Sequence, residues 1–458
     1  MKGRRILVWA MAGLLSSVVA PARGAAAEEE PGLKRTRADL ESGEQESQQT
    51  AETAEKGQDA EKRGWRTYWD EGLHLESEGG NFKVKIGGRF MLDGAIIDPD
   101  ASTREAFPDL AGTKGQIRRI RIYGDGTIYR NFVWKFQLDF YQMPNLLYKD
   151  VYVGMKNVPY LGTIRFGHQF EPFSLEEDTS TKFITMMERA LPTLAFYPTR
   201  NTGLLVFNTA LNKRLFWGAG AFIEEEDETP FEFAGDTGWN ASGRITGLPW
   251  FGGSDGLLHL GLGYIHKFRS ASTDDDWKVQ LRPTNSEANL VQPLIDTGKL
   301  VSEGADYFSP ELALVVGPFS VQGEYFHATV DRGVNDALGF QGFYVNASYF
   351  ITGESRVYDP STGSFGTVKP RRDFNFKRGS GWGSWEVALR YSSLDLNDKL
   401  IRGGAQRNIT LGLNWQLDPN VRIMFNYVHI HVDETTLGTQ PLVDGDTRVY
   451  QMRFQIAY

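Results

Sequence analysis

The sequence predicts an all-β fold, a transmembrane antiparallel β-barrel of about 16 strands with an inward-folded third external loop. Three observations predict it. Apolar and polar residues alternate with a period of two in many short segments, an export signal precedes one long undivided chain, and short and long connections alternate between the segments. Alternation alone does not establish a barrel, because a soluble β-sandwich also buries one face of each strand and exposes the other to water.

The alternation is clearest at the end of the chain. It covers four segments, 385–392, 409–416, 421–427 and 450–458. In the first, Val387 and Leu389 share one face while Arg390 lies on the other. Side chains of a strand point alternately to opposite faces, so each segment is predicted to be a strand with one apolar and one polar face.

Length and composition favour one membrane-embedded unit. The chain has 458 residues, 13% of them aromatic, and no cysteine. No linker divides residues 82–458, and outside the N-terminus no apolar run reaches the roughly 20 residues that a membrane helix needs. A membrane role must therefore come from strands.

The N-terminus is predicted to be a signal peptide, residues 1–27, cleaved near Ala27. It has an early basic region, an apolar run over 6–20, and small residues before Glu28. A membrane anchor is the alternative. Residues 28–64 form an acidic, low-complexity stretch, predicted to be a periplasmic tail that cannot fold alone. Residues 65–458 are the predicted barrel.

Twelve further segments bring the predicted strands to the even number that bacterial barrels use. They are 82–92, 119–128, 132–140, 149–155, 163–170, 203–211, 215–223, 239–248, 257–268, 307–316, 319–329 and 341–350. Short connections are predicted at 129–131, 157–162, 212–214, 317–318 and 418–420. Long ones are predicted at 93–118, 171–202, 224–238, 269–306, 393–408 and 431–446. Two connections break the alternation: 141–148 is short, and 351–384 is long. Short periplasmic turns opposite long external loops are typical of outer-membrane barrels.

Strand parity assigns the charged residues to faces. The basic residues predicted to face the lumen are Lys83, Lys85, Arg89, Arg119, Arg121, Lys135, Arg165, Arg244, Arg390, Arg422 and Arg453. The acidic ones are Asp93, Asp125, Asp139, Asp150, Glu311, Glu324 and Glu386. A wall with excess positive charge attracts anions, although such residues also pair across strands in porins without selectivity.

The connection 171–202 carries much apolar surface for an external loop, together with Lys182, Arg189 and Arg200. A loop folded against the inside of the wall would explain this composition. We therefore expect Arg165, Arg189 and Arg200 to lie near a constriction. The alternative is that Arg189 pairs with an acid such as Glu188 and only anchors the loop.

No catalytic motif is present, so no enzyme activity and no cofactor are expected. The seven histidines show no metal-ligand spacing, and His429 and His431 on one strand face do not make a site. The formal net charge is −9, which argues against nucleic acid as a partner.

Several stretches resemble the phosphate-selective porins O and P. They are residues 165–176, 187–189, 200–203, 351–356 with Tyr358, 383–386 with 390–392, and 414–415 with 420–422. The resemblance covers about residues 80–458. It implies a trimeric porin of the Gram-negative outer membrane with an inward-folded third loop and an arginine-rich path, and it accounts for the long connection 351–384.

The resemblance and the parity assignment together define the expected site and partners. The expected anion-binding or pore-lining residues are Arg165, Arg189, Arg200, Lys182, Arg119, Arg121, Arg244, Arg390, Arg422 and Lys135. The expected function is passive diffusion of small anions such as inorganic phosphate or polyphosphate, with outer-membrane lipid around a homotrimer. A non-selective porin and a barrel that tethers the envelope through residues 28–64 are the alternatives.

Overall fold

The computed structural model describes residues 64–458, except 142–145, 199, 226–237, 254–255, 270–276, 334, 377–380, 438 and 440. The predicted signal peptide and nearly all of the predicted tail lie outside the described residues. Within the described residues, sixteen antiparallel strands form the closed ring of an 18-stranded sheet. They are β3 (Phe82–Pro99), β4 (Gly112–Ile128), β5 (Phe132–Asp139), β6 (Leu147–Val158), β7 (Gly162–Gln169), β8 (Asn201–Ala210), β9 (Leu215–Ile223), β10 (Trp239–Phe251), β11 (Gly256–Phe268), β14 (Gly304–Val316), β15 (Phe319–Arg332), β16 (Asn335–Phe350), β19 (Ser384–Asp398), β20 (Ile401–Gln416), β21 (Val421–Thr435) and β22 (Leu442–Ala457).

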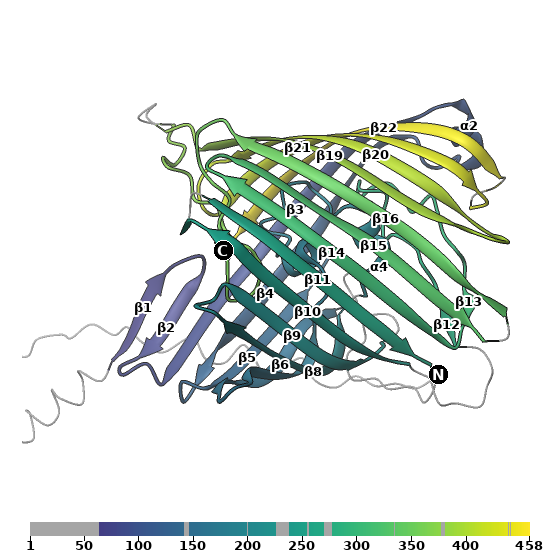
Figure 1. The fold of residues 1–458 in the computed structure, drawn as a ribbon. Helices are drawn as coiled ribbons and strands as arrows, with labels where there is room; N and C mark the ends of the chain where they lie inside the picture. Colours follow the sequence, from purple (N-terminus) through teal and green to yellow (C-terminus); the bar gives the residue numbers. More distant parts are fainter. Residues whose placement is uncertain are drawn as a thin grey trace, which may run out of the picture. The chain divides into compact units, whose positions relative to one another are not determined.

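The sheet closes on itself. The last strand, β22, pairs antiparallel with the first, β3, from Thr447 opposite Pro99 to Ala457 opposite Arg89. Every other strand of the ring pairs with its neighbour in the sequence, and Figure 1 shows the tilted strands side by side. Closure leaves no strand edge unpaired within the ring, which a wall surrounded by hydrocarbon requires. The predicted barrel and its strand number are confirmed.

Burial along the strands runs opposite to that of a soluble protein. On β19, Leu389 is 50% exposed while the neighbouring Arg390 is 1% exposed. On β20, Leu411 is 51% exposed and Asn414 only 2%. Exposed apolar side chains around buried charged ones exclude the β-sandwich, which would bury the apolar face.

Three of the predicted long connections are wrong, because the strands continue through them. β3 and β4 leave only residues 100–111 between them, β19 and β20 are joined by a tight turn, and β21 extends to Thr435. Within β19, Leu394 and Leu396 are fully buried. The apolar side chains there face the interior instead of the outside, so the pattern that marked the earlier part of the strand reverses while the strand continues.

The remaining elements are short. They are β1 (Trp65–Trp69), β2 (Leu73–Ser77), β12 (Lys278–Val279), β13 (Leu300–Val301), β17 (Tyr358–Asp359), β18 (Ser364–Phe365), α2 (Ala101–Ala106), α3 (Leu175–Asp178) and α4 (Leu191–Phe196). β1 and β2 form a hairpin that pairs with β3 through β2. Among the described residues, no helix is long and apolar enough to cross a membrane.

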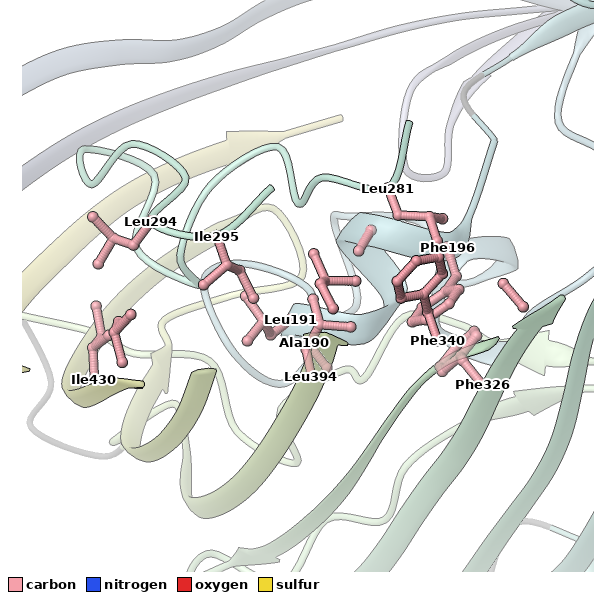
Figure 2. Packing of buried hydrophobic residues seen from close by; sticks show 14 of the residues in the cluster. Ala190, Leu191, Phe196, Leu281, Leu294, Ile295, Phe326, Phe340, Leu394 and Ile430 are labelled. Atoms are coloured by element: carbon pink, nitrogen blue, oxygen red, sulfur yellow. The ribbon is translucent and has the colours of Figure 1, made fainter. Parts of the chain in front are cut away.

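An apolar cluster joins two connections to the interior face of the strands (Figure 2). Residues 170–200, here called the 170–200 segment, contribute Leu191 and Phe196. Residues 277–303 contribute Ile295 and further buried apolar side chains. The ring of Phe196 stacks on that of Phe326 from β15, with centroids 5.9 Å apart. Burial of these side chains fixes both segments against the wall.

Placing a charge on the outward face should destabilise the barrel in lipid. We expect Leu411→Arg to lower the free energy of unfolding from vesicles by about 2–4 kcal/mol, the cost of arginine near the middle of a bilayer. Leu411 is exposed and central in the outward apolar row of β20.

The control for this change is Leu400→Arg. Leu400 is 94% exposed in the turn between β19 and β20, so the expected change is within about 0.5 kcal/mol. Equal effects of the two variants in urea unfolding of the folded protein would contradict an outward face of β20 that is surrounded by lipid.

Candidate functional site

Strands β3 and β4 present a group of arginines to the interior. Arg89 on β3 lies opposite Arg121 on β4, and Met91 lies opposite Arg119. A β-bulge follows, because Leu92 pairs with Ile117 and leaves Arg118 as the additional residue. The bulge re-aims the strand, so adjacent Arg118 and Arg119 both reach the same cavity.

The cavity has a volume of about 370 Å³ and is strongly basic. It lies between strands β3 to β6 and the 170–200 segment. Its basic lining residues are Arg89, Arg118, Arg119, Arg121, Lys135, Lys149, Arg189 and Arg200. Its acidic lining residues are Asp150, Glu177, Asp178 and Glu188. Eight basic side chains against four acidic ones give the excess of positive charge that attracts anions.

Some of this charge is neutralised in ion pairs. Asp150 accepts from Arg200 at 2.7 Å and from Lys135 at 2.8 Å. Arg189 pairs with Glu177 at 2.5 Å, and its guanidinium donates to the carbonyl oxygens of Glu176, Glu177 and Thr179. Arg189 therefore holds the 170–200 segment together as well as lining the cavity.

Two arginines of the cavity form no ion pair with any residue in the described part of the chain. Arg89 donates from Nη1 to the hydroxyl of Thr181 at 2.6 Å. Arg119 donates to the sulfur of Met91 at 3.5 Å, a weak contact. Their guanidinium charges are the uncompensated ones, and each retains donors for an oxyanion.

Glu188 connects the 170–200 segment to the wall. It accepts from Arg118 at 3.0 Å and from Arg453 at 2.6 Å. Burial raises the pKa of Glu188, but Arg118 and Arg453 outweigh burial and hold the pKa well below its usual range. The carboxylate therefore stays charged and anchors the segment beside the cavity.

Three of the expected site residues lie away from this cavity and bind the segments. Arg244 pairs with Glu311 at 2.9 Å and with Asp178 at 2.9 Å. Arg390 donates to the carbonyl oxygen of Glu188 and lies 3.1 Å from the carboxylate of Glu287. Arg422 donates to the carbonyl oxygens of Ile184 and Thr185. All three are buried.

The other expected residues are divided among three places. Arg119, Arg121, Lys135, Arg189 and Arg200 line the basic cavity. Arg165 lines an adjoining cavity instead, and Lys182 lines a third one beside Arg422. The structure thus brings Arg189 and Arg200 together and places Arg165 next to them.

Sequence reasoning missed Arg118 and Lys149. Arg118 fell in the predicted connection 93–118, but it lies within β4 as the additional residue of the bulge. Lys149 lies next to a register shift between β5 and β6, where counting alternate residues fails. Arg89 was expected to face the lumen but was not among the expected site residues. The cluster of arginines at 118–121 was the available signal.

One group of side chains in the described residues could hold a metal ion, His431 with Asp433 and Asp444. It lies near the end of β21, outside the basic cavity. Asp433 already pairs with Arg407 and with His431. The residues of the basic cavity, arginines and lysines, suit anions and not metal ions.

The closed ring, the apolar outer face and the basic interior define a porin-type barrel. The family model described as phosphate-selective porin O and P matches residues 84–458, so the chain belongs to that family. The family and the barrel fold indicate a protein of the Gram-negative outer membrane.

One curated relative and two solved structures are similar to this chain, the structures in fold alone. Porin O of Pseudomonas aeruginosa is 26% identical over 419 residues, which cover 84% of this chain and 90% of the relative. The anion-selective porin from Comamonas acidovorans shares the fold, with a TM-score of 0.51 at 12% identity, covering 82% of this chain and 100% of that one. The channel DcaP of Acinetobacter baumannii has a TM-score of 0.50 at 12% identity, covering 84% and 99%.

The charge of the interior should depend on pH near neutrality. Burial, reinforced by the charges of Arg89 and Lys85, lowers the pKa of Lys182 to about 7. Burial raises the pKa of Asp178 to about 7 against the opposing effect of Arg244. As pH falls through 7, Lys182 gains a proton and Asp178 loses its negative charge. Both changes make the interior more positive, so anion selectivity should rise between about pH 8.5 and about pH 5.5.

Reversal potentials in a KCl gradient would measure this dependence. The double variant Lys182→Gln with Asp178→Asn should show a flatter pH profile, while the wild type shows its midpoint near pH 7. A wild-type reversal potential that does not change over this range would contradict the assignment.

Proposed function

We propose that this porin forms a water-filled channel for the passive diffusion of small anions, with phosphate or polyphosphate as its preferred solute. The observation that carries the proposal is the basic cavity, in which Arg89 and Arg119 keep uncompensated charge. Guanidinium groups bind phosphate oxygens through paired hydrogen bonds, and rings of arginine and lysine form anion pores. The family description supports the same solute class.

We infer that the 170–200 segment folds into the lumen and narrows it. Its backbone contacts buried side chains from strands far apart in the ring: Glu324 on β15 accepts from the amide of Glu176, and Asn426 on β21 accepts from that of Met187. A segment held from several sides of a closed wall lies across the interior. The space left beside it is the basic cavity.

In such a site each charge acts strongly, because low-dielectric walls and few waters screen it little. An entering anion exchanges part of its hydration shell for hydrogen bonds from arginines. Arginines that are already paired with acids bind the anion more weakly than Arg89 and Arg119 do. Several stations of moderate strength allow the anion to leave again, which conduction requires.

Neutralising the unpaired arginines tests the proposal. The double variant Arg89→Gln with Arg119→Gln should move the reversal potential toward cation selectivity. It should also weaken the block of chloride current by phosphate by at least about tenfold, since charge-assisted hydrogen bonds contribute about 1.5–3 kcal/mol.

The matched control is Arg402→Gln. Arg402 has a side chain that is 62% exposed and lies at the start of β20, next to the turn after β19. Loss of this charge should leave the reversal potential and the block of chloride current by phosphate unchanged. If the double variant behaves like this control, Arg89 and Arg119 do not bind the permeating anion.

The proposal includes a homotrimer embedded in outer-membrane lipid. The outward apolar side chains, such as Leu389 and Leu411, suit hydrocarbon. The resemblance to the porin family supports three subunits, and closed symmetric rings are usual for identical chains.

Crosslinking of the protein in mild detergent should therefore stop at three subunits, and light scattering should give the mass of a trimer. Heating should then release the monomer. A single monomeric species before heating, by light scattering at the same detergent concentration, would be inconsistent with the trimer.

A further inference from the structure

A second cavity, of about 170 Å³, adjoins the basic one. The two share Lys135, Asp150, Phe170 and Asp178 as lining residues. The second cavity differs in character, because much of its wall is aromatic. Its aromatic lining residues are Tyr152, Phe170, Phe207 and Phe216. A polar interior is usual for a porin, so a patch of rings beside the path needs an explanation.

Arg165 is held between two of these rings. Its Cζ atom lies 4.6 Å from the ring centroid of Tyr152 and 4.6 Å from that of Phe207. It forms no ion pair with any residue of the described ranges, and its Nε is buried without a hydrogen-bond partner. Stacking fixes the plane of the guanidinium and leaves its charge uncompensated.

Phe170 forms the boundary between the two cavities. The guanidinium of Arg200 stacks on its ring, with Cζ 3.7 Å from the centroid, and the same guanidinium pairs with Asp150. An anion in the basic cavity therefore lies beside a wall that is cationic at one edge and aromatic beyond it.

A glycine lies against the wall of the aromatic cavity. Gly218 lies on β9, two residues after Phe216. A Cβ atom there would meet Pro172 at 3.4 Å, Phe207 at 3.5 Å and Phe216 at 3.6 Å. A larger side chain at this position would extend into the space between these residues.

We propose that the aromatic cavity is a subsite for the apolar group of an organic phosphate monoester, with Arg165 beside the phosphoryl group. The inference rests on the anion channel proposed above and narrows its substrate class. A cavity of about 150 Å³ lined by apolar side chains can hold benzene, so a phenyl ring fits one of this size. Phenyl phosphate is accordingly a suitable probe.

Block of chloride current through the full-length porin measures the preference. Phenyl phosphate should bind about tenfold more tightly than methyl phosphate or inorganic phosphate, since burial of a few apolar atoms contributes discrimination of this order. Phenol, which has the ring without the phosphoryl group, should not block. Equal block by phenyl and methyl phosphate would overturn the proposal.

Gly218→Leu fills the cavity without changing a charge. It should remove the additional affinity for phenyl phosphate and leave the block by inorganic phosphate and the reversal potential unchanged. The matched control is Gly243→Leu on the neighbouring strand β10. Gly243 faces the other side of the wall, where a Cβ atom would meet only the carbonyl oxygen of Gly218, at 3.6 Å.

A second variant covers the case in which Gly218→Leu does not fold. Phe216→Leu removes one ring and should weaken phenyl phosphate block several-fold with inorganic phosphate block retained. A preference for phenyl phosphate that survives in both folded variants would overturn the subsite. A wild-type channel without anion selectivity would instead refute the proposed function, which the reversal potential reports separately.

Discussion

One buried arginine connects the closure of the barrel to its interior. Arg453 on β22 lies opposite Asp93 on β3, across the seam where the ring closes, and pairs with it at 2.7 Å. The same guanidinium binds Glu188 of the 170–200 segment at 2.6 Å and is 1% exposed. Removing one partner of such a buried pair costs about 3–5 kcal/mol, because the other charge is left without compensation. The seam and the attachment of the 170–200 segment thus depend on one charge.

The buried arginines fall into two groups according to what faces them. Those on β10, β19, β21 and β22 meet acids of other strands and acids or backbone carbonyl oxygens of the connecting segments. Arg244, for example, meets both Glu311 and Asp178. Those on β3, β4 and β7 include Arg89, Arg119 and Arg165, which have no ion pair in the described chain. The two groups adjoin in the ring, because β22 pairs with β3. They also mix on one strand, since Arg118 and Arg121 of β4 pair with Glu188 and Asp139 while Arg119 has no ion pair in the described chain.

The alternation in the sequence predicted the strand number, the barrel and the faces of most charged residues. It did not predict the strand lengths. Leu389 faces outward and Leu394, five residues on, is fully buried inside. Where a strand extends beyond the hydrocarbon layer, its outward face no longer contacts lipid and can be polar. Its interior face packs there on the connecting segments and is apolar. The change of environment reverses which face is apolar without ending the strand. A prediction that expects apolar residues on the outward face throughout therefore makes the strands too short.

The alternation along a strand also cannot distinguish arginines that are free to bind a solute from arginines that pair with other residues of the protein. Arg390 and Arg119 were both predicted to line the pore, because the alternation places both on the interior face. Their difference depends on contacts between residues far apart in the chain, such as Arg390 with Glu188. Arg118 was missed for a local reason, because it fell in the predicted connection 93–118, whereas the structure makes it the additional residue of a bulge in β4. The selectivity of such a pore therefore depends on where the connections fold, and the net charge of a strand face does not determine it.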